Sequence, residues 1–140
     1  DYGLRLLQVA PLLAYYDIDP SIVKFVGTGA WDDPIFFNEP SLQGAIFPGI
    51  EFSKRKKLIN EYKNYYDDQL LRISTLPYDL VGLLSYLIIN DFNLGKFNKL
   101  FNNNIRFEGV DGSFYFKNNV IERELDILKI KNGKAIKSLK

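Results

Sequence analysis

The order of the hydrophobic patterns along this chain constrains its fold more than any other sequence feature. The patterns predict a helix, two short strands, three helices and finally strands joined by turns. This order is typical of an α/β fold with an antiparallel finish. The expected helices cover residues 3–16, 54–66, 76–89 and 95–101; the expected strands cover residues 22–26 and 42–47, a strand pair or bulged strand at 106–117, residues 121–130 after a turn at Asn118-Asn119, and a short terminal strand after a turn at Asn132-Gly133.

The segment 76–89 has the widest apolar stripe, and we expect it to form the most deeply buried helix. Its longest apolar run, residues 80–89, is interrupted by Gly82, Ser85 and Tyr86, so no run reaches the roughly 18 apolar residues of a membrane span. We therefore expect no transmembrane segment in this chain. The stripe consists of Leu76, Leu80, Val81, Leu84, Leu87 and Ile88.

The composition excludes several classes of protein. At 140 residues and 46% hydrophobic, the chain has the length of one ordinary domain or of part of a larger one. Its 18 basic and 17 acidic residues leave a net charge of +1, so no global field would hold it on nucleic acid or on an anionic membrane. We therefore expect no nucleic-acid partner.

Histidine and cysteine are both absent, which removes Ser-His-Asp and Cys-His triads, thiolate chemistry, disulfides and ordinary zinc sites. The adjacent carboxylates Asp32-Asp33 and Asp67-Asp68 do not converge on either a strand or a helix, so neither pair forms an acid-base dyad. We expect a protein that is not an enzyme and that has no cofactor and no metal site.

The loop 27–33 holds the most distinctive candidate site. Its two glycines suit a strand end that needs backbone freedom, and Trp31 is the only tryptophan of the chain. Asp32 or Asp33 could receive a ligand ammonium group, while a solvated or helix-capping role is the structural alternative. For Trp31 the alternatives are a ring that faces a ligand and a ring that packs in the core.

Two other motifs favour structural interpretations. The basic start of the 54–66 helix indicates a solvated face, with an anion or partner site as the alternative. The sequence EGVDGS at residues 108–113 contains only a fragment of a calcium-binding loop. The basic residues are Lys54, Arg55, Lys56 and Lys57.

Five segments together resemble the C-terminal part of the type I periplasmic binding-protein superfamily. The segments are GLRLLQVAPLLAYYDID, VKFVGTGAWDDP, EPSLQGAIFPG, YDLVGLLSYLI and FEGVDGSFYFKNNVIERELDILKI. The branch they resemble contains branched-chain amino-acid-type substrate-binding proteins and penicillin-binding protein activators. The most specific pieces are the APLL helix, GTGAWDD, the YD at the start of the apolar helix, and GVDGSFYF followed by VIERELDI.

The resemblance implies two α/β lobes joined by three crossings, with a ligand in the cleft between them. This chain would supply the C-terminal part of that fold, a parallel sheet flanked by helices with an antiparallel hairpin finish. Residues 1–71 would end the second lobe, residues 72–120 would return to the first lobe after a crossing near residues 71–76, and residues 121–140 would form the terminal return strands. Since the chain begins at Asp1 without an initiator Met, we expect an internal or C-terminal piece of a longer precursor.

The resemblance also implies a ligand site, because the loop 27–33 follows a second-lobe strand that faces the cleft in the family. Open α/β sheets bind ligands at the carboxyl ends of their strands, which agrees with this placement. Amino-acid binders carry an acidic residue where this chain has Thr28 and Gly29, and this departure favours the activator branch. The implied ligand-binding residues are Tyr2, Thr28, Gly29, Trp31, Asp32 and Asp33.

Two functions follow from the resemblance. The first is a non-catalytic periplasmic solute-binding protein of an ABC transporter, whose partners are a small ligand such as an amino acid and the transporter permease. The second is a penicillin-binding protein activator-like regulator, whose partner is a peptidoglycan synthase. Both imply the periplasm of a Gram-negative cell, with a lipid anchor upstream of Asp1 as an open option.

Overall fold

Two stretches that are far apart in the sequence come together in the first of two units of this chain. The computed structural model describes residues 3–90, 93, 95, 99 and 105–138. Unit 1 comprises Asp1–Phe52 and Leu125–Lys140, and unit 2 comprises Ser53–Glu124. The units divide at 52/53 and 124/125, and the expected lobe boundaries at 71/72 and 120/121 stay a prediction.

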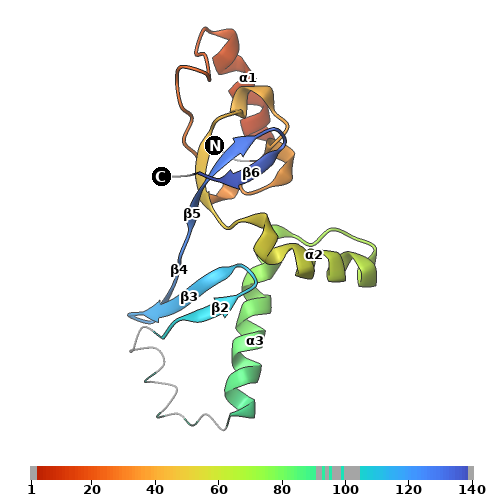
Figure 1. Cartoon of the computed structure of the whole chain (residues 1–140), viewed down its shortest axis with the longest axis vertical. Helices are drawn as coiled ribbons and strands as arrows, with labels where there is room; N and C mark the ends of the chain where they lie inside the picture. The colour runs from red at the N-terminus through yellow and green to blue at the C-terminus, as the bar shows by residue number, and fades with distance from the viewer. Residues whose placement is uncertain (1–2, 91–92, 94, 96–98, 100–104, 139–140) are drawn as a thin grey trace. The chain divides into compact units, whose positions relative to one another are not determined.

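Unit 1 contains the N-terminal helix and a three-stranded sheet (Figure 1). Helix α1, Leu4–Tyr15, confirms the expected first helix and tolerates Pro11 in its interior. The sheet has the order β1-β5-β6, with β1 at Ile46–Gly49, β5 at Asp126–Lys131 and β6 at Lys134–Lys137. All of these strand pairs are antiparallel, which confirms the expected hairpin finish.

The β5–β6 hairpin turns where the sequence predicted it. Asn132 has φ 51° and Gly133 has φ 72°, so both central residues are left-handed, as a type I′ turn requires. This turn sets the register in which Ile130 faces Ala135. With that register, Leu128 and Ile130 point into the unit and have no exposed surface.

The core of unit 1 is built from alternate residues of the sheet and from the short helical turns that precede it. Phe47 of β1 lies opposite Leu128 of β5, and both are fully buried. Burial of a side chain of this size contributes about 1.5–3 kcal/mol. The buried core residues are Leu6, Ala10, Trp31, Phe36, Phe37, Leu42, Ala45, Phe47, Leu128 and Ile130.

The expected strand at 22–26 was wrong except at its last residue. Val26 forms an isolated parallel bridge with Ile46, in which the Ile46 N–H donates to the Phe25 carbonyl at 3.0 Å. Upstream, the Asp19 carboxylate accepts a hydrogen bond from the Ser21 N–H at 2.7 Å and closes a turn. The N–H groups of Ile22 and Val23 also donate to the Asp19 carbonyl, so the first residues of the expected strand belong to this turn. The parallel sheet expected from the resemblance is represented, among the described residues, by this bridge.

The second expected strand, at 42–47, begins later than predicted. Pro40–Leu42 forms a 3₁₀ helix that the Glu39 carboxylate caps by accepting from the Ser41 N–H, so pairing starts only at Ile46. Two further 3₁₀ helices, Gly29–Trp31 and Pro34–Phe36, occupy the loop between the bridge and β1.

The described part of unit 2 includes helices α2 and α3 and a second antiparallel sheet (Figure 1). Helix α2, Phe52–Tyr66, and helix α3, Thr75–Ile89, confirm the expected helices, and a 3₁₀ turn at Arg72–Ser74 leads into α3. The sheet has the order β2-β3-β4, with strands at Phe107–Gly109, Gly112–Lys117 and Val120–Arg123. The left-handed pair Asn118 (φ 51°) and Asn119 (φ 62°) confirms the expected turn. The helix expected at 95–101 lies outside the described residues, apart from residues 95 and 99.

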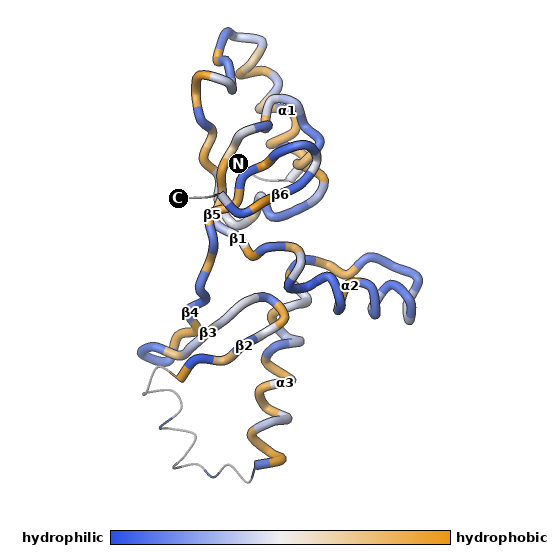
Figure 2. The backbone as a smooth tube through the Cα atoms, viewed as in Figure 1, coloured by the Kyte–Doolittle hydropathy of each residue, from blue (hydrophilic) through white to orange (hydrophobic). Residues whose placement is uncertain are grey.

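Helix α3 buries a different face from the one predicted. Its buried residues recur every fourth position, at Thr75, Asp79, Leu83 and Leu87. The expected stripe is exposed, except for Leu87, because one three-stranded sheet covers only one face of the helix. Figure 2 shows that α3 is apolar along most of its length, so its hydrophobic pattern could not select the face. The predicted buried face was therefore wrong, whereas α3 does bury more residues than either α1 or α2, as expected among the described helices.

The same apolarity bears on the expectation of no transmembrane segment. Arg72–Ile89 is long and apolar enough to cross a membrane by length and composition, and 22% of it is buried. Within this segment, however, Arg72 pairs with Asp111 and Asp79 pairs with Arg123 of the sheet. Those ion pairs favour a helix that packs in unit 2, and core helices of soluble proteins meet the same length criterion.

Candidate functional site

The loop 27–33 leaves the Val26 bridge and folds back over β1 through two 3₁₀ turns. The Gly27 N–H donates to the Ile46 carbonyl at 2.8 Å, which continues the parallel bridge by one residue. Thr28 then caps the first turn, because its hydroxyl accepts from the Ala30 N–H at 3.3 Å. Asp33 caps the second turn by accepting from the Ile35 N–H at 3.0 Å. Capping thus explains one of the two adjacent carboxylates.

Trp31 is buried in the core of unit 1, with 5% of its surface exposed. Its ring lies directly on Gly27, where a Cβ would overlap the ring carbons. Gly27 is therefore needed for close approach of the ring to the backbone. In this unit the ring serves core packing, and contact of Trp31 with a ligand stays a prediction.

The remaining predicted site residues divide between the interior and the surface. Asp32 is 3% exposed, and a Cβ on Gly49 would lie 3.5 Å from its Oδ2 atom, so the carboxylate lies against β1. Thr28, Gly29 and Asp33 are exposed, so the solvent-facing side of the loop consists of these three residues and Ala30. Tyr2 lies outside the described residues.

A buried charge cluster in unit 2 was not predicted from the sequence. The Asp111 carboxylate lies 3.3 Å from Arg55 Nη1 and 2.8 Å from Arg72 Nη1, and it accepts a hydrogen bond from the Thr75 hydroxyl at 3.0 Å. The Asp111 side chain is 3% exposed and that of Arg55 is 6% exposed. Arg55 therefore does not belong to the solvated face expected for residues 54–57.

Asp79 extends the cluster along α3. Its Oδ2 atom accepts from both terminal nitrogens of Arg123 at 3.1 Å, and its Oδ1 atom accepts from the Val110 N–H at 2.8 Å. A Cβ on Gly109 would collide with this carboxylate, so glycine is required there. Arg123 also lies over the Phe114 ring, 5.2 Å from its centroid. Its Nε atom is buried without a hydrogen-bond partner among the described residues.

These charged residues occupy the motifs that carried the resemblance. Asp79 belongs to the YD of the apolar helix, Asp111 to GVDG and Arg123 to VIER. The signal that could have revealed them is a charged residue inside an apolar helix, because Asp79 shares the four-residue spacing of Leu83 and Leu87. A carboxylate in that position requires a buried partner.

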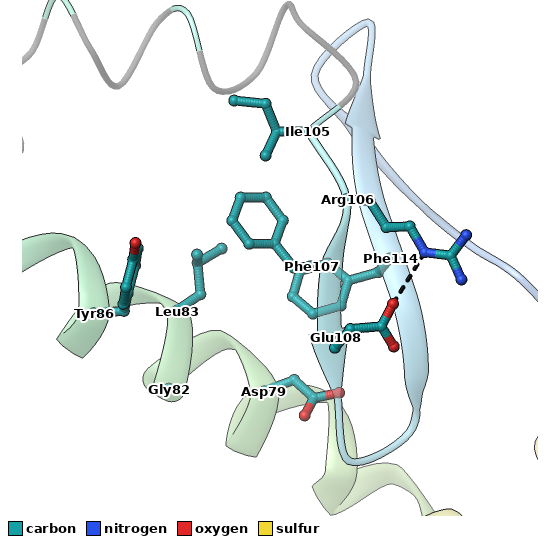
Figure 3. A pocket seen from close by; sticks show the side chains of 9 residues that line it. All are labelled: Asp79, Gly82, Leu83, Tyr86, Ile105, Arg106, Phe107, Glu108 and Phe114. Carbon is teal, nitrogen blue, oxygen red and sulfur yellow. Dashed lines mark hydrogen bonds and ion pairs between the residues drawn. The ribbon is translucent and has the colours of Figure 1, made fainter.

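An open groove of about 540 Å³ lies between α3 and the β2–β3 pair of unit 2 (Figure 3). Its floor is largely apolar, with Leu83 and Phe107 facing each other across it. At the rim, Arg106 Nε lies 3.0 Å from Glu108 Oε1, so these charges pair with each other. None of the predicted ligand-binding residues lines the groove, and we assign it no function.

Hydrogen bonds on the surface of the β2-β3-β4 sheet lower the pKa values of two carboxylates, Glu108 and Glu122. The Ser113 hydroxyl and then Arg106 hold the pKa of Glu108 below its usual value. The Tyr115 hydroxyl donates to Glu122 at 2.6 Å, which lowers the pKa of Glu122 and raises the pKa of Tyr115. Both bonds join neighbouring strands. In the described part of the chain, no group of three acidic residues is arranged to hold a metal ion.

Comparison with known proteins supports a partial binding-protein fold. No protein-family model and no curated protein sequence matches this chain. A solved protein described as a branched-chain amino-acid ABC transporter, from Rhodospirillum rubrum, superposes with a TM-score of 0.74 at 17% identity, over 93% of this chain and 41% of that one. The leucine-binding protein LivK from Thermotoga maritima superposes with a TM-score of 0.68 at 17% identity, over 99% of this chain and 42% of that one. This chain spans less than half the length of both proteins, and it has part of the type I periplasmic binding-protein fold.

Proposed function

We propose that this chain is part of a non-catalytic periplasmic solute-binding protein of the branched-chain amino-acid type. The complete protein would hold an amino acid or a similar small ligand between two lobes and present it to an ABC-transporter permease. The observation that carries the proposal is the fold similarity to two proteins whose names describe amino-acid transport or binding.

The division of the chain into two units supports a mechanism by lobe movement. Residues 53–124 form one unit, and the chain passes between the units at 52/53 and at 124/125. Few-residue connections of this kind can absorb the backbone rotations of hinge closure. A protein built in this way can bind its ligand by closing around it, without any catalytic group.

The exposed residues of the loop 27–33 are the part of this chain that we propose for ligand contact. Thr28, Gly29 and Asp33 follow the Val26 bridge, and ligands of open α/β sheets bind at the carboxyl ends of strands. Asp33 would pair with a ligand ammonium group. Trp31 and Asp32 would support the loop from inside the unit.

Calorimetric titration of the complete polypeptide that contains this chain, with leucine, isoleucine and valine in turn, tests the proposal. We expect saturable one-to-one binding of at least one of them. Asp33→Asn should weaken it by about thirtyfold or more, because loss of one partner of a charge pair costs about 2 kcal/mol or more. Asp17→Asn is a matched control, because Asp17 is also exposed in unit 1 and asparagine tolerates its positive φ of 64°.

Absence of heat with all three amino acids would contradict the proposal. An equal loss of affinity in the Asp17→Asn control would contradict the assignment of Asp33. The alternative partner, a peptidoglycan synthase, is not favoured by any described contact.

A further inference from the structure

We propose that Asp111 anchors both chain connections at the point where they leave unit 2, and thereby limits how far unit 1 moves relative to unit 2. The inference concerns positioning residues far from the candidate loop. Only the role of the movement, closure around a ligand, rests on the proposed function, because the anchoring itself needs no ligand.

The two connections begin close to the cluster in the sequence. Unit 2 runs from Ser53 to Glu124, so Arg55 is its third residue and Arg123 is its last but one. One connection therefore leads directly into Arg55, and the other leaves directly after Arg123. Any group that holds both arginines also fixes the two chain ends of unit 2.

Asp111 is such a group. Its Oδ1 atom pairs with Arg55 Nη1 at 3.3 Å, and its backbone carbonyl accepts from Arg123 Nη1 at 2.9 Å. Its Oδ2 atom lies 3.8 Å from the same Arg123 nitrogen. Arg72 and Thr75 hold this second oxygen from the start of α3. One residue at the turn between β2 and β3 thus joins both connections to the helix and to the sheet.

The last residue of unit 2 is held as well. The Glu124 N–H donates to the Ser113 carbonyl at 3.1 Å, and the Glu124 carboxylate pairs with Arg106 at 2.8 Å. The second contact involves side chains that are about half exposed, so water screens it. The buried contacts of Asp111 are screened much less by salt and should dominate the anchoring.

Anchoring in unit 2 confines bending to the few residues around 52/53 and 124/125. A hinge is a small number of residues that absorb large changes in φ and ψ, and its range depends on how firmly the flanking residues are held. Loss of the Asp111 charge would remove its ion pair with Arg55 and weaken its hold on Arg123. The connections would then become longer and more mobile, with no change at the candidate loop.

Pulsed electron paramagnetic resonance can measure this directly, because the chain has no cysteine and spin labels can be placed at chosen positions. A label at Gln8→Cys on α1 and one at Asn60→Cys on α2 report the distance between the units, since both positions are exposed. Labels at Val81→Cys on α3 and Val120→Cys on β4 report the integrity of unit 2.

We expect Asp111→Asn to broaden the distance distribution between the units at least twofold, with the distribution inside unit 2 unchanged. Glu61→Gln is the charge-matched control, since Glu61 makes only an exposed 3.8 Å contact with Lys57 among the described ion pairs. This control should leave both distributions unchanged. An unchanged distribution between the units in Asp111→Asn, with unit 2 intact, would overturn the proposal.

If Asp111→Asn disturbs unit 2 itself, Arg123→Lys provides the decisive variant. Lysine keeps the charge but lacks the planar fork that reaches Asp79 and the Asp111 carbonyl together. A broader distance distribution between the units in Arg123→Lys would support the anchoring role of Asp111, and an unchanged distribution would overturn it. Broadening without any heat on titration with leucine, isoleucine or valine would support the anchor and contradict the proposed function.

Discussion

Substitution of Gly27 by alanine should destabilise unit 1 through Trp31 alone. The backbone of Gly27 does not have a positive φ, so alanine is acceptable to the chain itself. The new Cβ would overlap the Trp31 ring, which is 5% exposed and enclosed by the core. Overpacking of this kind typically costs about 1–3 kcal/mol, and we expect about 2 kcal/mol for Gly27→Ala.

A double-mutant cycle isolates that cause. Trp31→Ala alone should cost about 3–5 kcal/mol through the cavity that it leaves. In the Trp31→Ala background, Gly27→Ala should cost no more than about 0.5 kcal/mol, as a substitution without a clash does. The coupling between the two sites should therefore be about 2 kcal/mol.

Amide hydrogen exchange of β5, followed by NMR, is the appropriate assay because it reports unit 1 separately from unit 2. The Ile130 N–H donates to the Ala45 carbonyl at 2.9 Å inside the core and exchanges only when the unit opens. A loss of 2 kcal/mol corresponds to exchange that is about thirtyfold faster. Equal acceleration by Gly27→Ala in the presence and absence of Trp31 would refute the close packing described for the loop.

Three further outcomes are expected. Leu128→Ala should lower the free energy of unfolding of unit 1 by about 2–5 kcal/mol in the same exchange assay, because Leu128 is fully buried; a change below 1 kcal/mol would contradict this. Gly133→Ala should cost about 1–2 kcal/mol, since φ is 72° and a Cβ would lie 2.6 Å from Asn38 Oδ1; a neutral effect would argue against the left-handed turn. Because the pKa of Glu108 is lowered on folding, the ionised carboxylate should stabilise unit 2 at pH values above 4.5, the ordinary pKa of a glutamate. This contribution should disappear as the pH falls through the folded-state pKa. The difference in stability between the parent chain and Glu108→Gln should therefore shrink on acidification, and a difference that grows would contradict the assignment.

Local signals in the sequence predicted the elements that depend on local physics. The turns at Asn118-Asn119 and Asn132-Gly133 were predictable because asparagine and glycine tolerate the left-handed region that hairpin turns require. Helices α2 and α3 were predictable from their length and periodicity. The resemblance of the motifs predicted the binding-protein fold that the comparisons support.

Features that depend on contacts distant in sequence were not predictable in this way. The β-branched run 22–26 has strand propensity, yet its first residues belong to the Asp19 turn and only Val26 forms a bridge with β1. Helix α3 is apolar on more than one face, so its periodicity predicts a helix without selecting the buried face, and the ion pair of Asp79 with Arg123 selects it. Arg55 looked like one of four basic surface residues, because its partner Asp111 lies 56 residues further along the chain.

Small-angle X-ray scattering of the complete polypeptide that contains this chain tests the central proposal most directly. The measurement compares the radius of gyration without ligand and with saturating leucine, isoleucine and valine together. A solute-binding protein that closes around its ligand should become measurably more compact, and Asp33→Asn should reduce this response at a limiting ligand concentration. Identical scattering curves with and without the three amino acids would contradict the proposed function.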